Sequence, residues 1–259
     1  MKKSSEIIAF FNNKGGVGKT TTAINVAAAF RRSGKRVLLV DLDGQANATM
    51  ASGVILPEDC RTIYDSFGDG KAPSIFQGTS GIHVIPSDRR MYYIDQELAN
   101  KENRGYILAS ILSTLRNHYD YIVLDCPPAF GTASVNGLYA ADWVILVSNM
   151  SGMTTMSTGD IMDMINMSFS SSGKKKIIGY VWTMNRHTSE NKQVAELVKQ
   201  QYGPLPFDTT IRMTTYISEA AAVRKDIFEY NKDCEGAKDY YNLSLEIEHR
   251  INTITGNGK

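Results

Sequence analysis

Residues 13–20 read Asn13-Lys14-Gly15-Gly16-Val17-Gly18-Lys19-Thr20, and they stand between two segments of contrasting pattern. The preceding residues 7–11 are apolar and are followed by two asparagines, which predicts a short buried strand. From Lys19 to Arg32 the apolar residues recur at helical spacing. A glycine-rich turn between a strand and a helix is the context that a phosphate-binding loop needs.

The residue types of this loop suit the phosphates of a nucleotide. Backbone N–H groups in a glycine turn form a nest for anions, and the following helix adds the positive end of its dipole. We expect Lys19 to hold the β- and γ-phosphates and the Thr20 hydroxyl to bind Mg²⁺. Two features depart from the common GxxxxGK[ST] pattern, because Asn13 replaces the first glycine and a second lysine, Lys14, lies inside the loop.

Apolar strands alternate with helices along the rest of the chain. The pattern predicts strands at residues 37–40, 82–86, 121–124, 144–147 and 177–183, and helices at residues 88–116 with a break near Gly105, 135–141, 154–167, 190–201 and 237–254. This alternation indicates an α/β fold, in which a mostly parallel, twisted sheet has helices on both faces. Because no long linker or repeat interrupts it, we interpret residues 1–259 as a single-domain P-loop NTPase, and residues 168–176 as a surface loop.

Three aspartates follow neighbouring strands of the predicted sheet. Asp125 ends the strand at residues 121–124, as a magnesium-positioning aspartate does, although a simple turn residue is the alternative. Asp41 and Asp43 follow the strand at residues 37–40, and their i, i+2 spacing puts both on one side of an extended chain. Ligands bind at the carboxyl ends of strands in such sheets, so we expect all three aspartates near the phosphate loop.

The overall composition is that of a globular protein. Of the 259 residues, 42% are hydrophobic and 21% are charged, which argues against disorder and collagen. Cys60, Cys126 and Cys234 lie far apart, which suits neither a zinc knuckle nor a disulfide framework and fits a reducing cytoplasm. The sequence contains no apolar run of the about 18 residues that span a bilayer, and its N-terminus does not resemble a signal peptide.

The formal net charge of +1 hides a segregation of charge along the chain. Residues 1–36 have a balance of +7, residues 37–173 of −8, residues 174–225 of +5 and residues 226–259 of −3. Ordinary solvated faces account for this pattern as well as a binding surface does. If residues 174–225 contact DNA, their basic side chains neutralise backbone phosphates. The candidates are Lys174, Lys175, Lys176, Arg186, Lys192, Lys199, Arg212, Arg224 and Lys225.

Four segments resemble motifs of the ParA/MinD family of deviant Walker A ATPases. Residues 14–21, Lys-Gly-Gly-Val-Gly-Lys-Thr-Thr, are similar to the signature loop of that family. Residues 37–45 resemble the motif VLLxDxDPQ, residues 45–49 resemble a QxNAT-like tail of ParA proteins, and residues 119–128 resemble YDxIxxDxPP. The resemblance extends over essentially the whole chain and implies a ParA/Soj-type protein that hydrolyses ATP to ADP with Mg²⁺.

The resemblance also implies roles for individual residues. Lys14 matches the lysine that reaches across an ATP-sandwich dimer to the partner's phosphates, and Asp43 matches the aspartate that orients the hydrolytic water. Asn185 is expected to recognise adenine, with a strand-end turn residue as the alternative. The catalytic set is therefore Lys14, Lys19 and Asp43. The nucleotide-binding set is Lys14, Gly15, Gly16, Val17, Gly18, Lys19, Thr20, Thr21 and Asn185. The metal set is Thr20, Asp41 and Asp125.

Three positions depart from the family pattern. Gly44 replaces the usual proline of the second motif. Arg212 stands where proline is typical, and Met213 stands where arginine is typical.

Several branches of the family share this chemistry. The leading hypothesis is a DNA-partitioning ATPase of plasmids or chromosomes. Such a protein is cytoplasmic and nucleoid-associated, dimerises with ATP, binds DNA non-specifically and is stimulated by a ParB-like centromere-binding partner. Another cargo-positioning ParA-like ATPase stays open. A MinD-like membrane switch is the alternative, but residues 242–254 carry more acid than base, which favours core packing and no membrane partner.

Two further classes fit the sequence poorly. A bacterial tyrosine kinase has a denser tyrosine tail than Tyr240-Tyr241, and a nitrogenase iron protein needs cysteines placed to bridge a dimer. We also expect no helix-turn-helix domain before the phosphate loop, because the first strand begins near Glu6.

Overall fold

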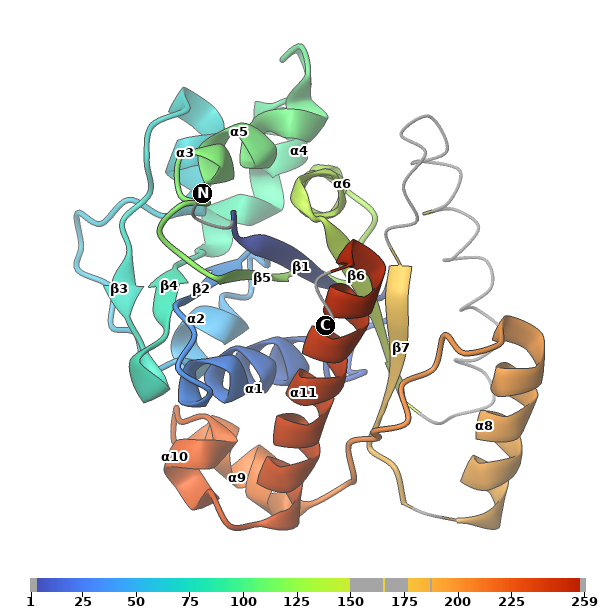
Figure 1. Cartoon of the computed structure of the whole chain (residues 1–259). Coiled ribbons are helices and arrows are strands. Elements are labelled where there is room, and N and C mark those ends of the chain that lie inside the picture. The colour runs from blue at the N-terminus through green and yellow to red at the C-terminus, as the bar shows by residue number, and fades with distance from the viewer. Residues whose placement is uncertain (1–3, 150–164, 166–176, 187, 257–259) are drawn as a thin grey trace.

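The computed structural model describes residues 4–149, 165, 177–186 and 188–256, except for the side chains of residues 190, 192, 194, 201 and 202. The predicted helix over residues 154–167 and the predicted loop over residues 168–176 lie outside the described residues, apart from Ile165. Within the described part, helices lie on both sides of one central sheet (Figure 1).

The described residues form a seven-stranded sheet in the order β3-β4-β2-β5-β1-β6-β7. All neighbouring strands pair in parallel except β3 and β4. The strands are β1 (Glu6–Phe11), β2 (Val37–Asp41), β3 (Phe76–Gln77), β4 (His83–Ile85), β5 (Tyr121–Asp125), β6 (Trp143–Asn149) and β7 (Ile177–Thr183). The predicted α/β class with a mostly parallel sheet is confirmed.

Helices cover both faces, as the uninterrupted apolar strands predict. In Figure 1, α1, α9, α10 and α11 lie on one side of the sheet and α3 to α6 on the other. Strand β1 supplies both cores, since Ile8 and Phe10 point to one hydrophobic cluster and Ile7 and Phe11 to the other. The helices are α1 (Lys19–Arg32), α2 (Asn47–Ala51), α3 (Ile63–Asp69), α4 (Ile94–Glu97), α5 (Ile107–Ser113), α6 (Thr132–Ala140), α8 (Ser189–Tyr202), α9 (Thr215–Ala222), α10 (Ile227–Asn231) and α11 (Glu235–Thr255).

The prediction of a long helix over residues 88–116 is wrong. This region holds 3-10 turns and the short helices α4 and α5. Asn103 has a left-handed backbone with φ of 55°, which ends any continuous helix there. At Gly105, a side-chain Cβ would lie 3.0 Å from the Tyr139 ring, so this turn packs closely against α6. The predicted break near Gly105 is confirmed, but the hydrophobic pattern did not reveal the 3-10 turns and the short length of α4 and α5.

The C-terminal helix α11 belongs to the core. Its Tyr240, Leu243, Ile247 and Ile251 are buried in the same cluster as residues of α1. This confirms the predicted core packing of the tail. None of the described helices is long and apolar enough to cross a membrane.

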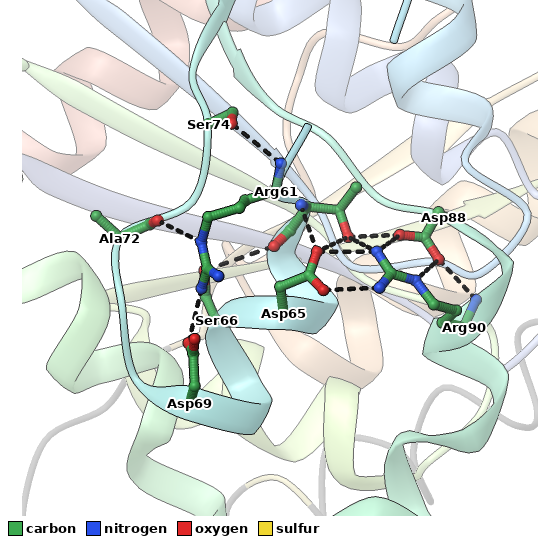
Figure 2. Close-up of polar contacts among 9 residues, drawn as sticks. Arg61, Asp65, Ser66, Asp69, Ala72, Ser74, Asp88 and Arg90 are labelled. Atoms are coloured by element: carbon green, nitrogen blue, oxygen red, sulfur yellow. Dashed lines mark hydrogen bonds and ion pairs between the residues drawn. The ribbon is translucent and has the colours of Figure 1, made fainter. Parts of the chain in front are cut away.

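A cluster of charged side chains joins α3 to the segment after β4 (Figure 2). Arg90 donates hydrogen bonds to both oxygens of Asp65, at 2.7 and 2.8 Å, and to both oxygens of Asp88, at 2.9 and 2.8 Å. Thr62 precedes α3 and forms a capping box with Asp65, and its hydroxyl also donates to Asp88 at 2.5 Å. We call Thr62, Asp65, Asp88 and Arg90 the Arg90 clamp.

Candidate nucleotide-binding site

The glycine-rich loop has the backbone that its sequence predicts. Gly16 and Gly18 have φ of 71° and 85°, a left-handed conformation that glycine adopts without strain. Gly18 stands directly before α1, so the loop leads into the N-terminal end of that helix. The Thr183 hydroxyl at the end of β7 donates to the carbonyl oxygen of Val17 at 2.7 Å. The loop is thereby tied to a strand that is distant in sequence.

The two loop lysines differ in their environments. Lys19 is only 6% exposed, and its Nζ donates to the carbonyl oxygen of Lys14 at 2.8 Å. Burial lowers the pKa of Lys19, whereas the nearby Asp125 carboxylate opposes that shift. The side chain of Lys14 is exposed, and its backbone N–H donates to Oδ1 of Asn12 at 2.9 Å. Lys19 is thus held at the base of the loop and Lys14 at its outer surface.

The strand register brings the predicted aspartates together. In the pairing of β2 with β5, Asp41 stands directly opposite Asp125, and Asp125 also pairs with Phe10 of β1. Strand β1 leads into the glycine-rich loop, so the carboxyl ends of three adjacent strands meet at this site. The strand register thus confirms that Asp41 and Asp125 lie side by side at the carboxyl ends of neighbouring strands.

Asp41 anchors the segment that follows it. One carboxylate oxygen accepts from the Thr49 N–H and hydroxyl, both at 2.8 Å, and the other accepts from the Asp43 N–H at 3.0 Å. Burial raises the pKa of Asp41 to about 6, although the Thr49 hydrogen bonds act in the opposite direction. Asp43 is half-buried, and its Oδ1 accepts from the Gln45 N–H at 2.9 Å. Thr49 is a site residue that sequence reasoning did not single out, though it ends the QxNAT-like motif.

Asp125 is fully buried, and neither of its carboxylate oxygens has a hydrogen-bond partner among the described residues. Burial and the adjacent Asp41 raise its pKa well above the usual range. The Thr20 hydroxyl and Lys19 lie near enough to lower that pKa, yet the hydroxyl is not in hydrogen-bond geometry. A buried carboxylate in this state is stabilised by taking up a proton or by binding a cation.

The cation that fits this edge of the sheet is Mg²⁺. The described residues contain no group of three or more His, Cys, Asp or Glu side chains that could hold a metal alone. Mg²⁺ usually binds one or two carboxylates together with phosphates and waters, so a fully protein-built cage is not required. Asp125 and Thr20, with Asp41 behind them, match that sparse protein contribution.

A cavity of about 380 Å³ opens beside the first turn of α1. Thr20 and Thr21 line it, together with α2, α9 and the exposed side chains of Arg224 and Lys225. Sequence patterns did not indicate this cavity, because α2 and α9 are short and come from distant parts of the chain.

Asn185 follows β7 and is only 7% exposed. Its Nδ2 donates to the Thr210 hydroxyl at 3.0 Å, and its Oδ1 accepts from Asn191 at 3.1 Å. Its backbone also pairs with Ile211 and Met213. These contacts join β7 to the segment before α9, and adenine recognition by Asn185 stays a prediction.

The described residues place only some of the candidate DNA contacts. Lys174, Lys175 and Lys176 lie outside the described residues, as does the side chain of Lys192. The side chains of Arg186, Lys199, Arg224 and Lys225 are exposed. Arg212 differs, because its guanidinium donates to both oxygens of Asp239, at 2.7 and 2.8 Å. Its charge is therefore committed to an internal ion pair.

Comparisons with known proteins agree with these features. The family profile that matches the chain is described as an AAA domain and covers residues 5–177. The chromosome partitioning protein ParA of Caulobacter vibrioides is 33% identical over 252 residues, which cover 94% of this chain and 94% of that protein. The chain belongs to the ParA/MinD family. The family predicted from the sequence motifs is thus confirmed.

A second curated relative and a solved structure match the chain over a similar span. The sporulation initiation inhibitor protein Soj of Bacillus subtilis is 32% identical, and the match covers 93% of this chain and 98% of Soj. Among solved structures, cobyrinic acid a,c-diamide synthase of Mycobacterium smegmatis holds an ATP analogue and magnesium. It superposes with a TM-score of 0.82 at 25% identity, over 93% of each chain.

Proposed function

We propose that this ParA/MinD-family protein is a Mg²⁺-dependent ATPase that partitions DNA. The single observation that carries the ATPase proposal is the meeting of the glycine-rich loop with the unpartnered Asp125 at one sheet edge. The similarity to ParA and Soj along nearly the whole chain supports the partitioning role.

In this proposal each residue of the site has one task. The loop N–H groups and Lys19 bind the phosphates. The phosphate charge stabilises the buried Lys19 ammonium, which burial alone would destabilise. Mg²⁺, when bound, neutralises phosphate charge, and Thr20 and Asp125 would hold it, with Asp41 steadying the adjoining segment. Asp43 orients the attacking water. Lys14 reaches the phosphates of a second copy and offsets the charge that develops during transfer.

The exposed position of Lys14 supports an ATP-dependent homodimer, because an exposed side chain is accessible to the phosphates of a second copy. If Lys14 acts on the phosphates of the second copy, the catalytic site is complete only in the dimer, and hydrolysis is then coupled to dimerisation. The DNA-bound, nucleoid-associated form would be the ATP dimer, and a ParB-like partner would reset it by stimulating hydrolysis.

One ATPase assay with and without DNA tests the catalytic part of the proposal. We expect Lys14→Ala to abolish hydrolysis and dimerisation, and Asp43→Ala to accumulate as an ATP-bound dimer in size-exclusion chromatography with light scattering. Normal hydrolysis by Asp43→Ala would show that its assigned role is wrong.

DNA binding is tested separately. Retention on DNA should require ATP and weaken steeply with salt, since basic side chains release counterions when they bind phosphates. The double variant Arg224→Ala/Lys225→Ala should reduce both the affinity and the salt slope. The control Lys71→Ala/Lys232→Ala removes the same charge from two other exposed positions and should leave both unchanged. Equal retention of apoprotein and ATP-bound protein would contradict the proposal.

A further inference from the structure

The turn that carries Asp43 is covered by an aromatic ring. Asp43 begins the turn, and the Ala46 N–H donates to its carbonyl oxygen at 2.9 Å. Tyr92, which lies 47 residues after Gln45, places its ring against Gly44, and the Gln45 side-chain amide donates to the Tyr92 hydroxyl. Gly44 is buried as a result, whereas Tyr92 itself is 53% exposed. The ring therefore contacts the turn while about half of the side chain stays exposed to solvent.

A side chain at position 44 is disfavoured by the lack of space beside Tyr92 and not by the φ angle of the backbone. Its φ does not fall in the left-handed region, so any L-residue could adopt this conformation. A Cβ at position 44, however, would lie 3.1 to 3.2 Å from three ring atoms of Tyr92, which is tighter than ordinary contact. The ring therefore occupies the volume that a side chain would need.

A glycine in this turn leaves the backbone freer than any other residue does. The turn is tied on its inner side by Asp41, which accepts from the N–H groups of Asp43 and Thr49. On its outer side the contacts come from Tyr92, with the ring on Gly44 and the hydroxyl on Gln45. Asp43 lies between these two attachments, so both determine where its carboxylate points.

We propose that Tyr92 is a positioning residue for Asp43, which presses on Gly44 and holds Gln45 so that the turn keeps one conformation. The inference rests on the proposed role of Asp43 in orienting water. It predicts that Gly44 and Tyr92 act as one unit, since each is shaped to the other. Catalytic geometry is sensitive at this level, because a displacement of about 1 Å can reduce turnover up to about 100-fold.

The test compares Tyr92→Ala, Gly44→Ala and the double variant with wild type, and uses Tyr93→Ala as the matched control. Tyr93 is the neighbouring tyrosine and is 61% exposed. Hydrogen–deuterium exchange of the apoprotein over residues 43–49 reports the turn directly, and kcat and KM for ATP report catalysis. Binding of a fluorescent ATP analogue is measured in parallel, so that loss of binding is separated from loss of turnover.

We expect Tyr92→Ala to speed exchange over residues 43–49 by about 10-fold and to lower kcat by about 10-fold, with KM and analogue binding within about 2-fold. Gly44→Ala should lower kcat similarly, because its Cβ displaces the ring. The double variant should be no worse than Tyr92→Ala, since the space is then open, and such non-additivity marks a coupled pair. Tyr93→Ala should match wild type.

The proposal is overturned if Tyr92→Ala resembles Tyr93→Ala in exchange, or if exchange rises while kcat is unchanged. Additive losses in the double variant would also overturn the coupling. If wild type does not hydrolyse ATP, the proposed function is wrong, and the exchange experiment alone then decides whether Tyr92 holds the turn.

Discussion

Two groups of aspartates near the carboxyl ends of the strands have pKa values that are shifted in opposite directions. At the nucleotide edge, burial raises the pKa of Asp41 to about 6 and that of Asp125 well above its usual range. In the Arg90 clamp (Figure 2), partial burial also acts to raise the pKa of Asp65 and Asp88, but hydrogen bonds from Arg90 and Thr62 outweigh it and lower both.

The difference lies in how completely each carboxylate is satisfied. The clamp supplies its own cation, so it is complete without a ligand and serves the structure. Asp125 lacks a partner among the described residues, and the unfavourable free energy of burying its charge is relieved by a proton or by a bound cation. The carboxylate without a protein partner, Asp125, therefore marks the ligand-binding site, whereas the paired carboxylates of the Arg90 clamp stabilise the fold.

The largest expected effect is that of Asp125→Asn. Removing this charge should lower ATP hydrolysis by at least about 100-fold. The metal loses a ligand, and the charge that develops during phosphoryl transfer is then less well neutralised. The same change should raise the melting temperature of the apoprotein by several degrees, since an isosteric amide has no buried charge to desolvate. Calorimetry and an ATPase assay measure the two effects. A variant that is both inactive and less stable would break the comparison.

The pH dependence of stability should be the next largest effect. Asp41 has a folded-state pKa of about 6, above its usual value of 3.8, so the folded protein binds more protons in this window. Its stabilising contribution is present below about pH 4 and is lost as pH rises through 6. We expect the free energy of unfolding of the apoprotein to fall by on the order of 2 kcal/mol between pH 4 and 6.

Urea titrations across pH 4 to 7 measure this slope, and Asp41→Asn is the comparison. The variant should show a flatter profile whatever its absolute stability, because it lacks one of the two buried carboxyl groups with a raised pKa and removes that charge from beside the other, Asp125. The clamp aspartates do not mask the effect, since their lowered pKa values place their own loss of stabilisation at lower pH. An equal slope in both proteins would show that Asp41 does not contribute to the pH dependence.

Arg90→Met should separate structure from function. It leaves Asp65 and Asp88 facing each other without their cation, and we expect the free energy of unfolding to fall by about 1–2 kcal/mol. This value allows for solvent screening, because the Arg90 side chain is 47% exposed. ATP hydrolysis should stay within about 2-fold of wild type. A large loss of kcat at unchanged stability would place the clamp in the catalytic machinery.

The smallest effect is expected for Arg61→Met. Arg61 makes one ion pair, with Asp69 at 2.7 Å, and both side chains are more than a third exposed. Solvent-exposed pairs of this kind contribute little to stability. Urea unfolding beside Arg90→Met checks the ranking. If Arg61→Met is the more destabilising change, the number of hydrogen bonds to carboxylates is the wrong guide to the stability that these pairs contribute.

The nucleotide edge could be predicted because its signals are local. The glycine pattern at residues 15–18 specifies a left-handed turn before a helix, and Asp41 and Asp125 directly end apolar strands. Parallel pairing then forces those strand ends to one edge. The break near Gly105 was also predicted from the sequence, whereas the helix over residues 88–116 is wrong in its length, because this region forms a 3-10 turn at Arg89–Tyr93 and only the short helices α4 and α5.

The sequence by itself determined the fold class, the phosphate loop and the residues that would carry its chemistry, because each depends on short-range spacing and on strand direction. Only the tertiary structure decided that Arg90 joins two aspartates, that Arg212 is committed to Asp239 and that Tyr92 covers Gly44. These contacts join side chains that are brought together by packing of distant segments. Spacing along the chain does not encode them, since they depend on where each element rests on the sheet.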